Sequence, residues 1–197
     1  MPGRGPRVGL LGGSFNPAHE GHRHVAELAL RRLRLDQVWL MVSPGNPLKP
    51  RRGMAAFADR LASAAAVADG RRVVATGIER RLGTVYTLDT LRALRRRFPG
   101  TRFVWLMGAD ILAELPRWRR WVELVRVVPF AVLPRPSYTR RALAGQAARR
   151  LRACRIPARA AATLAGRTPP AWVFLPAREV GVSATALRGS GRVVWAV

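Results

Sequence analysis

The chain has 197 residues, of which 49% are hydrophobic, and a formal net charge of +24 at pH 7. This length suits one folded domain with a sizeable core, and the composition excludes an intrinsically disordered protein. A single cysteine, Cys154, excludes an internal disulfide framework and fits a reducing compartment. The chain opens without a basic and then apolar leader, and no apolar run is long enough to cross a membrane. We therefore expect a cytoplasmic protein with no membrane partner.

The basic charge comes almost entirely from arginine, because Lys49 is the only lysine in the chain. Such a surface would attract nucleic acid or steer anionic substrates toward the protein. The sequence contains no RNA-binding motif and no dense set of aromatic residues on which bases could stack. We therefore favour a solvated arginine-rich surface over nucleic-acid binding.

Short apolar runs alternate with longer amphipathic stretches along the chain. The runs predict strands at 8–11, 37–42, 72–75, 103–107, 130–133 and 172–175. The amphipathic stretches predict helices at roughly 19–34, 55–69, 86–98, 118–125 and 138–154. This alternation is typical of an α/β protein with a doubly wound, Rossmann-like parallel sheet that is covered by helices on both faces. We expect one domain spanning 1–197, in which the Ala- and Arg-rich segment 140–170 forms a helical excursion or an assembly face.

The most informative segment follows the first predicted strand. Residues 12–22 read Gly-Gly-Ser-Phe-Asn-Pro-Ala-His-Glu-Gly-His, which predicts a glycine-rich turn and then the start of a helix. Free backbone N–H groups and the positive end of the helix dipole make such a turn a binding site for phosphate. His19 and His22 would lie on one face of the first helical turn, and Gly21 between them leaves room for a ligand.

Polar residues also follow other predicted strands. Lys49 ends the segment 43–49, and Gly108 and Asp110 come directly after the strand at 103–107. A later segment, 182–188, reads as a helix N-terminus with hydroxyl and guanidinium groups from Ser183, Thr185 and Arg188. Ligands of open parallel sheets bind at the carboxyl ends of the strands, so we expect these segments to form one site.

The early histidine-bearing turn and the late Ser-x-Thr-x-x-Arg segment together resemble the nucleotidyltransferase superfamily that is related to class I aminoacyl-tRNA synthetases. Within it, the chain is most similar to the bacterial nicotinate-nucleotide adenylyltransferase family. The resemblance covers roughly residues 7–135 and 172–188, and it is supported by the segments 44–49, 86–91, 108–112 and 116–121.

The resemblance implies transfer of AMP from ATP to nicotinate mononucleotide with Mg²⁺, giving deamido-NAD and pyrophosphate, with no protein side chain dedicated to the metal. It implies that His19, His22 and Arg188 are the catalytic residues, the two histidines neutralising the phosphates of ATP. The residues implied to bind ATP are Gly12, Ser14, Phe15, His19, His22, Gly108, Asp110, Ser183, Thr185 and Arg188. Gly13, Ser14 and Lys49 would contact nicotinate mononucleotide, whose carboxylate would meet the backbone around Tyr86 and Thr87.

The resemblance also implies that Trp118 stacks on the pyridine ring, although a plain core or surface tryptophan is an alternative. Ser14 and Asn16 stand where threonine and aspartate are usual, and the chain after Arg188 departs from the family pattern. Nicotinamide mononucleotide and phosphopantetheine remain alternative acceptors, and a non-catalytic nucleic-acid-binding module is a more distant alternative. The sequence leaves the oligomeric state open, with a homo-oligomer as one option.

Overall fold

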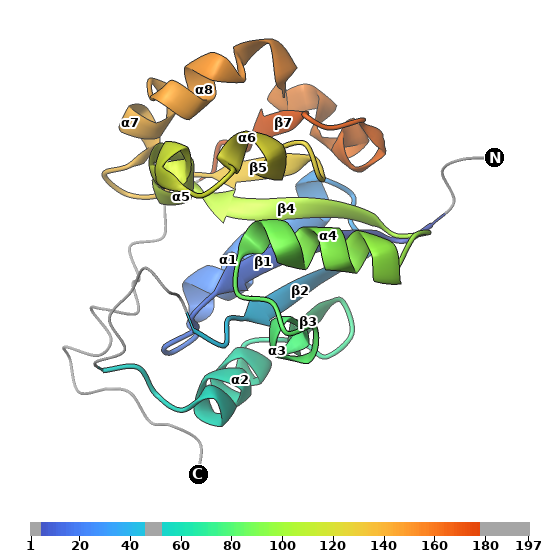
Figure 1. The fold of residues 1–197 in the computed structure, drawn as a ribbon, viewed down its shortest axis with the longest axis vertical. Helices are drawn as coiled ribbons and strands as arrows, with labels where there is room; N and C mark the ends of the chain where they lie inside the picture. The colour runs from blue at the N-terminus through green and yellow to red at the C-terminus, as the bar shows by residue number, and fades with distance from the viewer. Residues whose placement is uncertain (1–4, 46–52, 178–197) are drawn as a thin grey trace.

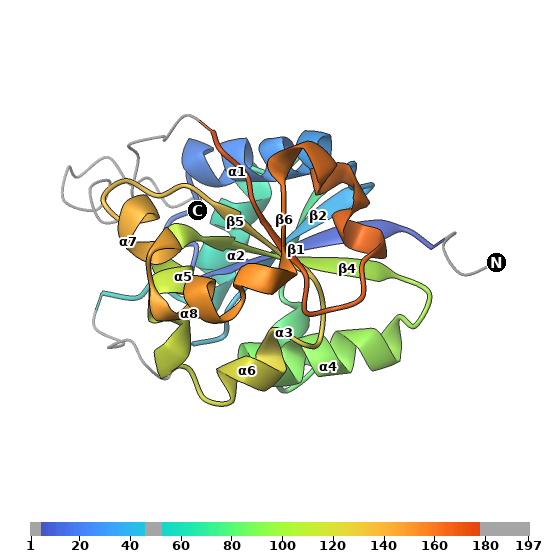
Figure 2. The same ribbon diagram turned by 90° about the horizontal axis from the view of Figure 1, so that it is seen from above.

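The computed structural model describes residues 5–45 and 53–177. Its centre is one parallel sheet of seven strands in the order β3-β2-β1-β4-β5-β7-β6. Helices cover both faces of this sheet, as Figure 2 shows in a view along its edge. The predicted Rossmann-like α/β fold is therefore confirmed. The strand order reverses between β1 and β4, the position at which open parallel sheets bind their ligands.

The strands are β1 (Arg7–Gly13), β2 (Gln37–Val42), β3 (Val73–Thr76), β4 (Arg102–Gly108), β5 (Phe130–Leu133), β6 (Arg155–Ile156) and β7 (Trp172–Phe174). The α-helices are α1 (Glu20–Arg32), α2 (Phe57–Ala66), α3 (Ile78–Arg81), α4 (Thr87–Arg97), α5 (Ala109–Glu114), α6 (Trp121–Leu124), α7 (Thr139–Leu143) and α8 (Gln146–Arg150). Three 3₁₀ segments complete the set, η1 (Leu115–Arg117), η2 (Arg152–Cys154) and η3 (Ala158–Gly166). Figure 1 shows their arrangement around the sheet.

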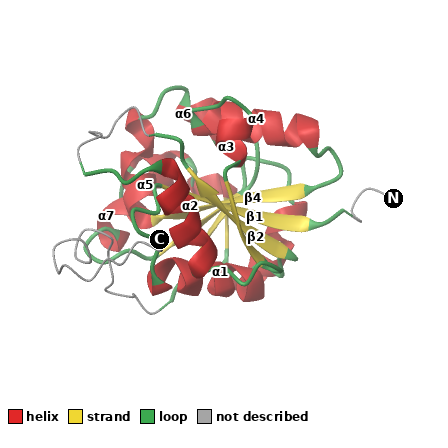
Figure 3. Cartoon of the chain, turned by 90° about the horizontal axis from the view of Figure 1, so that it is seen from below, coloured by secondary structure: helices red, strands yellow, loops and turns green. Residues whose placement is uncertain are grey.

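The apolar residues of the strands divide into two core clusters, one on each face of the sheet. One cluster joins Leu91 and Leu94 of α4 to the aromatic residues Trp105, Phe130 and Trp172. The other packs α1 and α2 against the opposite face, through residues that include Leu33 and Ala64. Figure 3 shows the helices surrounding the strands. Burial on both faces explains why the strands read as continuous apolar runs rather than alternating ones.

Several predicted boundaries are wrong. The helix predicted at 138–154 is broken into α7, α8 and η2. The break between α7 and α8 is at Gly145, which has an extended backbone and lies so close to α7 that a Cβ there would meet its carbonyl oxygens at 3.1 and 3.2 Å. The helix predicted at 118–125 is only the single turn of α6. The sequence reading also missed α3, α5 and the two-residue strand β6, which are too short to show a period.

The Ala- and Arg-rich segment 140–170 contributes to the core. Ala161, Leu164 and Ala165 of η3 are buried in the cluster that also contains Ala131 and Val173 of the sheet. Alanines on this segment allow close packing on the strands, while its arginines face outward. Within the described residues, no helix is both long and apolar enough to cross a membrane.

Candidate active site at the carboxyl ends of the strands

The glycine-rich turn at the end of β1 is held by a buried aromatic ring. Phe15 is 1% exposed and has a φ of +47°, in the left-handed region that non-glycine residues seldom adopt. Its ring lies against Gly13, where a Cβ atom would come within 3.2 Å of it, and 4.9 Å from the ring of His22. Packing thus fixes an unfavourable backbone conformation at the point where the chain passes from the sheet to α1.

The two histidines of the motif form a reciprocal cap at the N-terminus of α1. The backbone N–H of Gly21 donates to Nδ1 of His19 at 3.1 Å, and the backbone N–H of His19 donates to Nδ1 of His22 at 3.1 Å. Their ring centroids are 4.0 Å apart. Because both Nδ1 atoms accept, each neutral ring carries its proton on Nε2. The cap therefore gives the site two adjacent Nε2–H donors.

Both histidines have a pKa below the ordinary value. Burial lowers the pKa of His22 to about 3, with further contributions from His19 and Arg135. Burial is also the main reason that the pKa of His19 is lowered, and Arg135 adds to it. The two rings are therefore neutral at pH 7 in the substrate-free protein. An incoming phosphate would favour their protonated forms.

Arg135 is a candidate site residue that the sequence reading missed. It follows β5, and its Cδ atom would be 4.0 Å from a Cβ atom placed on Gly108. Its guanidinium lies close enough to His19 and His22 to lower the pKa of both. Arg135 is exposed, so its cationic group is open to an anionic ligand. Its position after a strand end was the available signal in the sequence, but with 34 arginines in the chain this position alone did not distinguish it from the others.

Gly108 and Asp110 form the start of α5 at the carboxyl end of β4. The carboxylate of Asp110 folds back over Gly108 so closely that a side chain on Gly108 would collide with it. Gly108 has an extended backbone and occupies the N-cap position. The turn from β4 into α5 thus brings Gly108 and Asp110 together, as predicted. The strand that leads into this turn, β4, pairs with β1 in the sheet.

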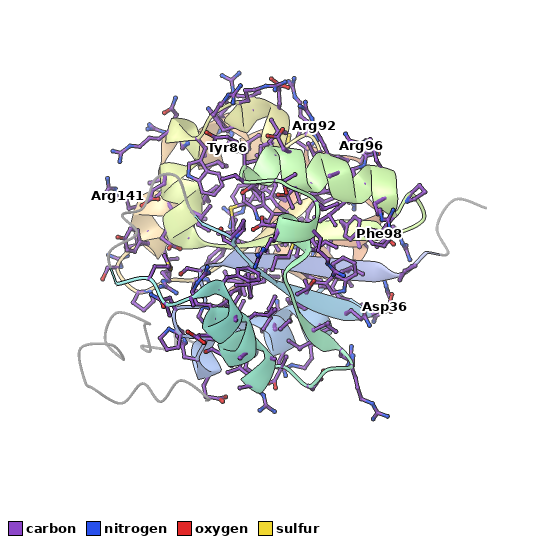
Figure 4. The ribbon with its side chains drawn as sticks, turned by 60° about the horizontal axis from the view of Figure 1, so that its bottom comes forward. Asp36, Tyr86, Arg92, Arg96, Phe98 and Arg141 are labelled. Carbon is purple, nitrogen blue, oxygen red and sulfur yellow. The ribbon has the colours of Figure 1, made fainter. Side chains whose placement is uncertain are left out.

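Tyr86 and Thr87 stand at the N-terminus of α4, as predicted. Tyr86 occupies the N-cap position, where no side chain caps the helix, and the residue is 44% exposed. Figure 4 labels its side chain. The first amides of a helix have no acceptor within it, so this end can receive a carboxylate. The guanidinium of Arg119 lies 5.7 Å from the centre of the Tyr86 ring. This contact brings the neighbouring Trp118 to the same end of α4.

Trp118 is half-buried, and its ring centroid lies 6.0 Å from that of Trp105 in the core. The ring therefore combines a packing contact with an exposed remainder that a ligand can reach. Its neighbour Trp121 is also half-buried and packs against the same core.

A buried carboxyl group, Glu79 on α3, supports the loop before α4. Its Oε1 accepts a hydrogen bond from the Thr90 hydroxyl at 3.2 Å, and its carbonyl accepts from the backbone N–H of Thr84 at 3.0 Å. The hydroxyls of Thr84 and Thr90 are 2.8 Å apart. Burial raises the pKa of Glu79 from its ordinary 4.5 to about 7. This network ties α3 to the loop that ends at Tyr86.

The raised pKa of Glu79 predicts a pH-dependent stability. The folded protein binds this proton more tightly than the unfolded chain, so the contribution is complete below pH 4.5 and is lost as the pH rises through about 7. At about 1.4 kcal/mol per unit, the loss is roughly 3 kcal/mol. Glu79→Gln should remove it, so the variant should lose less unfolding free energy between pH 4.5 and 8 in urea titrations. Equal losses in the two proteins would contradict the assignment.

The remaining predicted site residues, Lys49, Ser183, Thr185 and Arg188, lie outside the described residues. In residues 5–45 and 53–177, no group of three or more His, Cys, Asp or Glu side chains is placed to hold a metal ion. Gly12 lies in β1 with open space around it, because a Cβ there would have only the end of Met41 within 4 Å, at 3.9 Å.

Comparison with known proteins identifies the family to which the chain belongs. The family model of cytidylyltransferase-like proteins matches residues 10–190. The chain belongs to this family. Its curated relatives include a probable nicotinate-nucleotide adenylyltransferase of Gluconacetobacter diazotrophicus, which is 64% identical over 95% of this chain and 87% of the relative. A second, from Gluconobacter oxydans, is 61% identical over 94% of this chain and 95% of the relative.

The same fold is also found in more distant solved structures. The nicotinic acid mononucleotide adenylyltransferase of Plasmodium falciparum, complexed with NaAD, matches 93% of this chain and 83% of its own with a TM-score of 0.70 and 14% identity. At that identity the likeness concerns the fold. The close relatives establish that this member of the family belongs to its nicotinate-nucleotide adenylyltransferase branch, which confirms the resemblance seen in the sequence motifs.

Proposed function

We propose that the protein transfers the adenylyl group of ATP to nicotinate mononucleotide, releasing deamido-NAD and pyrophosphate in NAD biosynthesis. The observation that carries this proposal is the pair of Nε2–H donors on His19 and His22 at the glycine turn. They belong to a chain whose relatives of more than 60% identity are named for this activity. We also propose that residues 1–197 form one nucleotidyltransferase domain, and its single cysteine fits a cytoplasmic enzyme.

The reaction joins two anions, so its barrier is mainly one of position and electrostatics. An oxygen of the mononucleotide phosphate attacks the α-phosphorus of ATP, and the bond to pyrophosphate breaks. No protein nucleophile is needed. His19 and His22 would donate to the ATP phosphates as negative charge moves onto the leaving group. Arg135, together with Ser183, Thr185 and Arg188, would bind the same phosphates, and Gly12, Ser14 and Phe15 would line the junction of the two substrates.

Mg²⁺ would arrive with ATP as part of the substrate. This ion keeps several water ligands and binds readily to phosphate oxygens, so it does not need a site built from many side chains.

The acceptor would lie between the turn and the N-terminus of α4. The backbone around Tyr86 and Thr87 would bind the nicotinate carboxylate, and Trp118 would stack on the pyridine ring. Gly13, Ser14 and Lys49 would lie near the mononucleotide phosphate. A charged carboxylate at a helix N-terminus is favoured over a neutral amide, which supports nicotinate over nicotinamide mononucleotide.

The Gly108–Asp110 contact predicts an effect on ATP binding. In Gly108→Ala the new methyl group would displace the Asp110 carboxylate, which we place on the adenosine ribose. Loss of a hydrogen bond to a charged group costs about 1.5–3 kcal/mol, so KM for ATP should rise by roughly 10- to 100-fold. KM for the acceptor should change little in steady-state assays. Gly166→Ala is the matched control, since nothing lies within 4 Å of that site. Equal effects on both substrates would contradict the role of Asp110.

Pyrophosphate release tests the proposed activity. The purified protein is supplied with Mg²⁺, ATP and one acceptor: nicotinate mononucleotide, nicotinamide mononucleotide or phosphopantetheine. We expect the highest kcat/KM with nicotinate mononucleotide and formation of deamido-NAD in equal amount to pyrophosphate. A preference for either other acceptor would correct the substrate. No release with any acceptor from folded protein would overturn the proposed function.

A further inference from the structure

A buried arginine, Arg60 on α2, lies directly beneath the site. Only 3% of it is exposed, and its guanidinium donates to three backbone carbonyls from three different segments. Its Nη1 donates to Ser14 O and to Ser43 O, both at 2.8 Å. Its Nε donates to Ala55 O at 3.1 Å. The guanidinium carbon also lies 5.5 Å from the centre of the Phe57 ring.

Burying a guanidinium among carbonyls is costly when no carboxylate neutralises it. None of the ion pairs found in residues 5–45 and 53–177 includes Arg60. Burial alone accounts for the lowered pKa of its guanidinium. A methionine or leucine would fill a core position on α2 without this cost. We therefore explain the presence of an arginine at this position by its hydrogen bonds to the three backbone carbonyls.

The two carbonyls that Nη1 joins belong to the turns after β1 and β2. Ser14 lies in the glycine-rich turn that would contact both substrates. Ser43 begins the turn that leads toward Lys49, on the proposed acceptor side, and its backbone N–H donates to Gly13 O at 2.9 Å. One nitrogen atom thus fixes the distance between two strand-end turns of the site.

The segment that carries Arg60 holds the glycine turn at two further points. The Asn16 amide donates to Gly53 O at 2.8 Å and accepts from the backbone N–H of Ala55 at 3.1 Å. The backbone N–H of Ala18 donates to the Ser63 hydroxyl at 2.9 Å. Helix α2 itself packs on β2 and β3 and is thereby part of the rigid sheet layer. The turn is thus attached to a stable support through side chains rather than through its own backbone alone.

We propose that Arg60 is a positioning residue for adenylyl transfer: it sets the alignment of the ATP-side turn at Ser14 with the acceptor-side turn at Ser43. This inference rests on the proposed function. An arginine is required because a planar fork can reach several carbonyls in fixed directions, whereas a lysine ammonium cannot. Misalignment of two bound reactants lowers the rate of the chemical step more than it weakens their binding.

The test compares Arg60→Ala and Arg60→Lys with the wild type at saturating ATP and nicotinate mononucleotide. We expect kcat to fall at least tenfold in both variants, while each KM stays within about threefold. Guanidinium chloride at about 20 mM, against NaCl at equal concentration, should restore part of the kcat of Arg60→Ala by refilling the cavity. It should not help Arg60→Lys, in which the ammonium occupies that space.

Arg102→Ala is the matched control. The Arg102 guanidinium also donates to a backbone carbonyl, Gly5 O at 2.9 and 3.1 Å, but at the opposite end of the sheet. Its kcat should equal that of the wild type, with and without guanidinium. If Arg60→Ala does not fold, Arg60→Lys alone tests the inference, because its kcat should fall at least tenfold while each KM stays within about threefold. The inference would be overturned if a folded Arg60 variant kept the wild-type kcat. It would also be overturned if kcat and the affinity for the substrates fell by the same factor. An inactive wild type would instead overturn the proposed function.

Discussion

Replacing His22 by alanine is expected to lower kcat by roughly 10²–10³, the usual effect of losing one preorganised donor to a developing negative charge. The structure gives the reason for so large an effect. The His22 ring is held by the hydrogen bond that its Nδ1 accepts and by the neighbouring rings of Phe15 and His19. No reorganisation is then needed when charge moves onto pyrophosphate.

The state of the His22 ring adds a pH signature. Because its pKa is about 3, the ring is neutral in the free enzyme throughout the physiological range. The ionisation of His22 should therefore not appear near pH 6.5 in the pH profile of kcat/KM, and His22→Ala should leave the shape of the profile in that region unchanged. The linked stability has a defined sign as well: it is present above pH 6.5 and is lost as the pH falls toward 3.

The measurement is kcat at saturating substrates for His22→Ala and for His24→Ala, the matched control. His24 lies on the same helix, but its Nε2 is buried without a hydrogen-bond partner among the described residues. We expect His24→Ala to keep the wild-type kcat. A folded His22→Ala protein with an unchanged rate would remove His22 from the mechanism.

Replacing Trp118 by alanine is expected to raise KM for nicotinate mononucleotide by about one to two orders of magnitude. Stacking of a heteroaromatic ring on an aromatic side chain is worth about 1–3 kcal/mol, which corresponds to this range. KM for ATP should change little, because we place ATP on the turn and α5, beyond the end of α4. The Trp118 ring is only half-buried beside Trp105, and we propose its remaining surface for stacking.

Trp118→Phe separates stacking from packing, since a phenylalanine ring keeps an aromatic face. It should recover most of the acceptor binding that Trp118→Ala loses. Titration of each variant with nicotinate mononucleotide and, separately, with ATP gives the comparison. A similar loss of affinity for both substrates would identify Trp118 as a core residue whose removal disturbs the whole site.

The sequence predicted the sheet because its buried strands read as apolar runs, and it predicted the longer helices because they carry a visible period. Leu88, Leu91 and Leu94 on the inner face of α4 are buried, and all six predicted strands exist. The short elements were not predicted, because they contain too few residues to show a pattern. The four residues of α3 and the two of β6 form only because the rest of the chain brings them together, and no local pattern reveals that.

The candidate site was predicted to a similar extent. The histidine turn, Gly108–Asp110 and the start of α4 do lie at strand or helix ends, where the motif positions them. Neutral histidines were not foreseen, because their pKa depends on burial that only the folded chain shows. Arg60 and Arg135 were missed as site residues, since each acts through partners that are distant in the sequence. Among 34 arginines, composition alone cannot distinguish a buried one from a solvated one.

The central claim is direct attack by the mononucleotide phosphate on the α-phosphorus of ATP, aligned by the turns after β1 and β2. The stereochemistry at phosphorus tests it most directly, with an ATP analogue whose α-phosphorus is chiral through one sulfur atom. We predict inverted configuration in the deamido-NAD analogue, because a single in-line displacement inverts the phosphorus. Retention of configuration would require a covalent adenylyl-protein intermediate and would contradict the account.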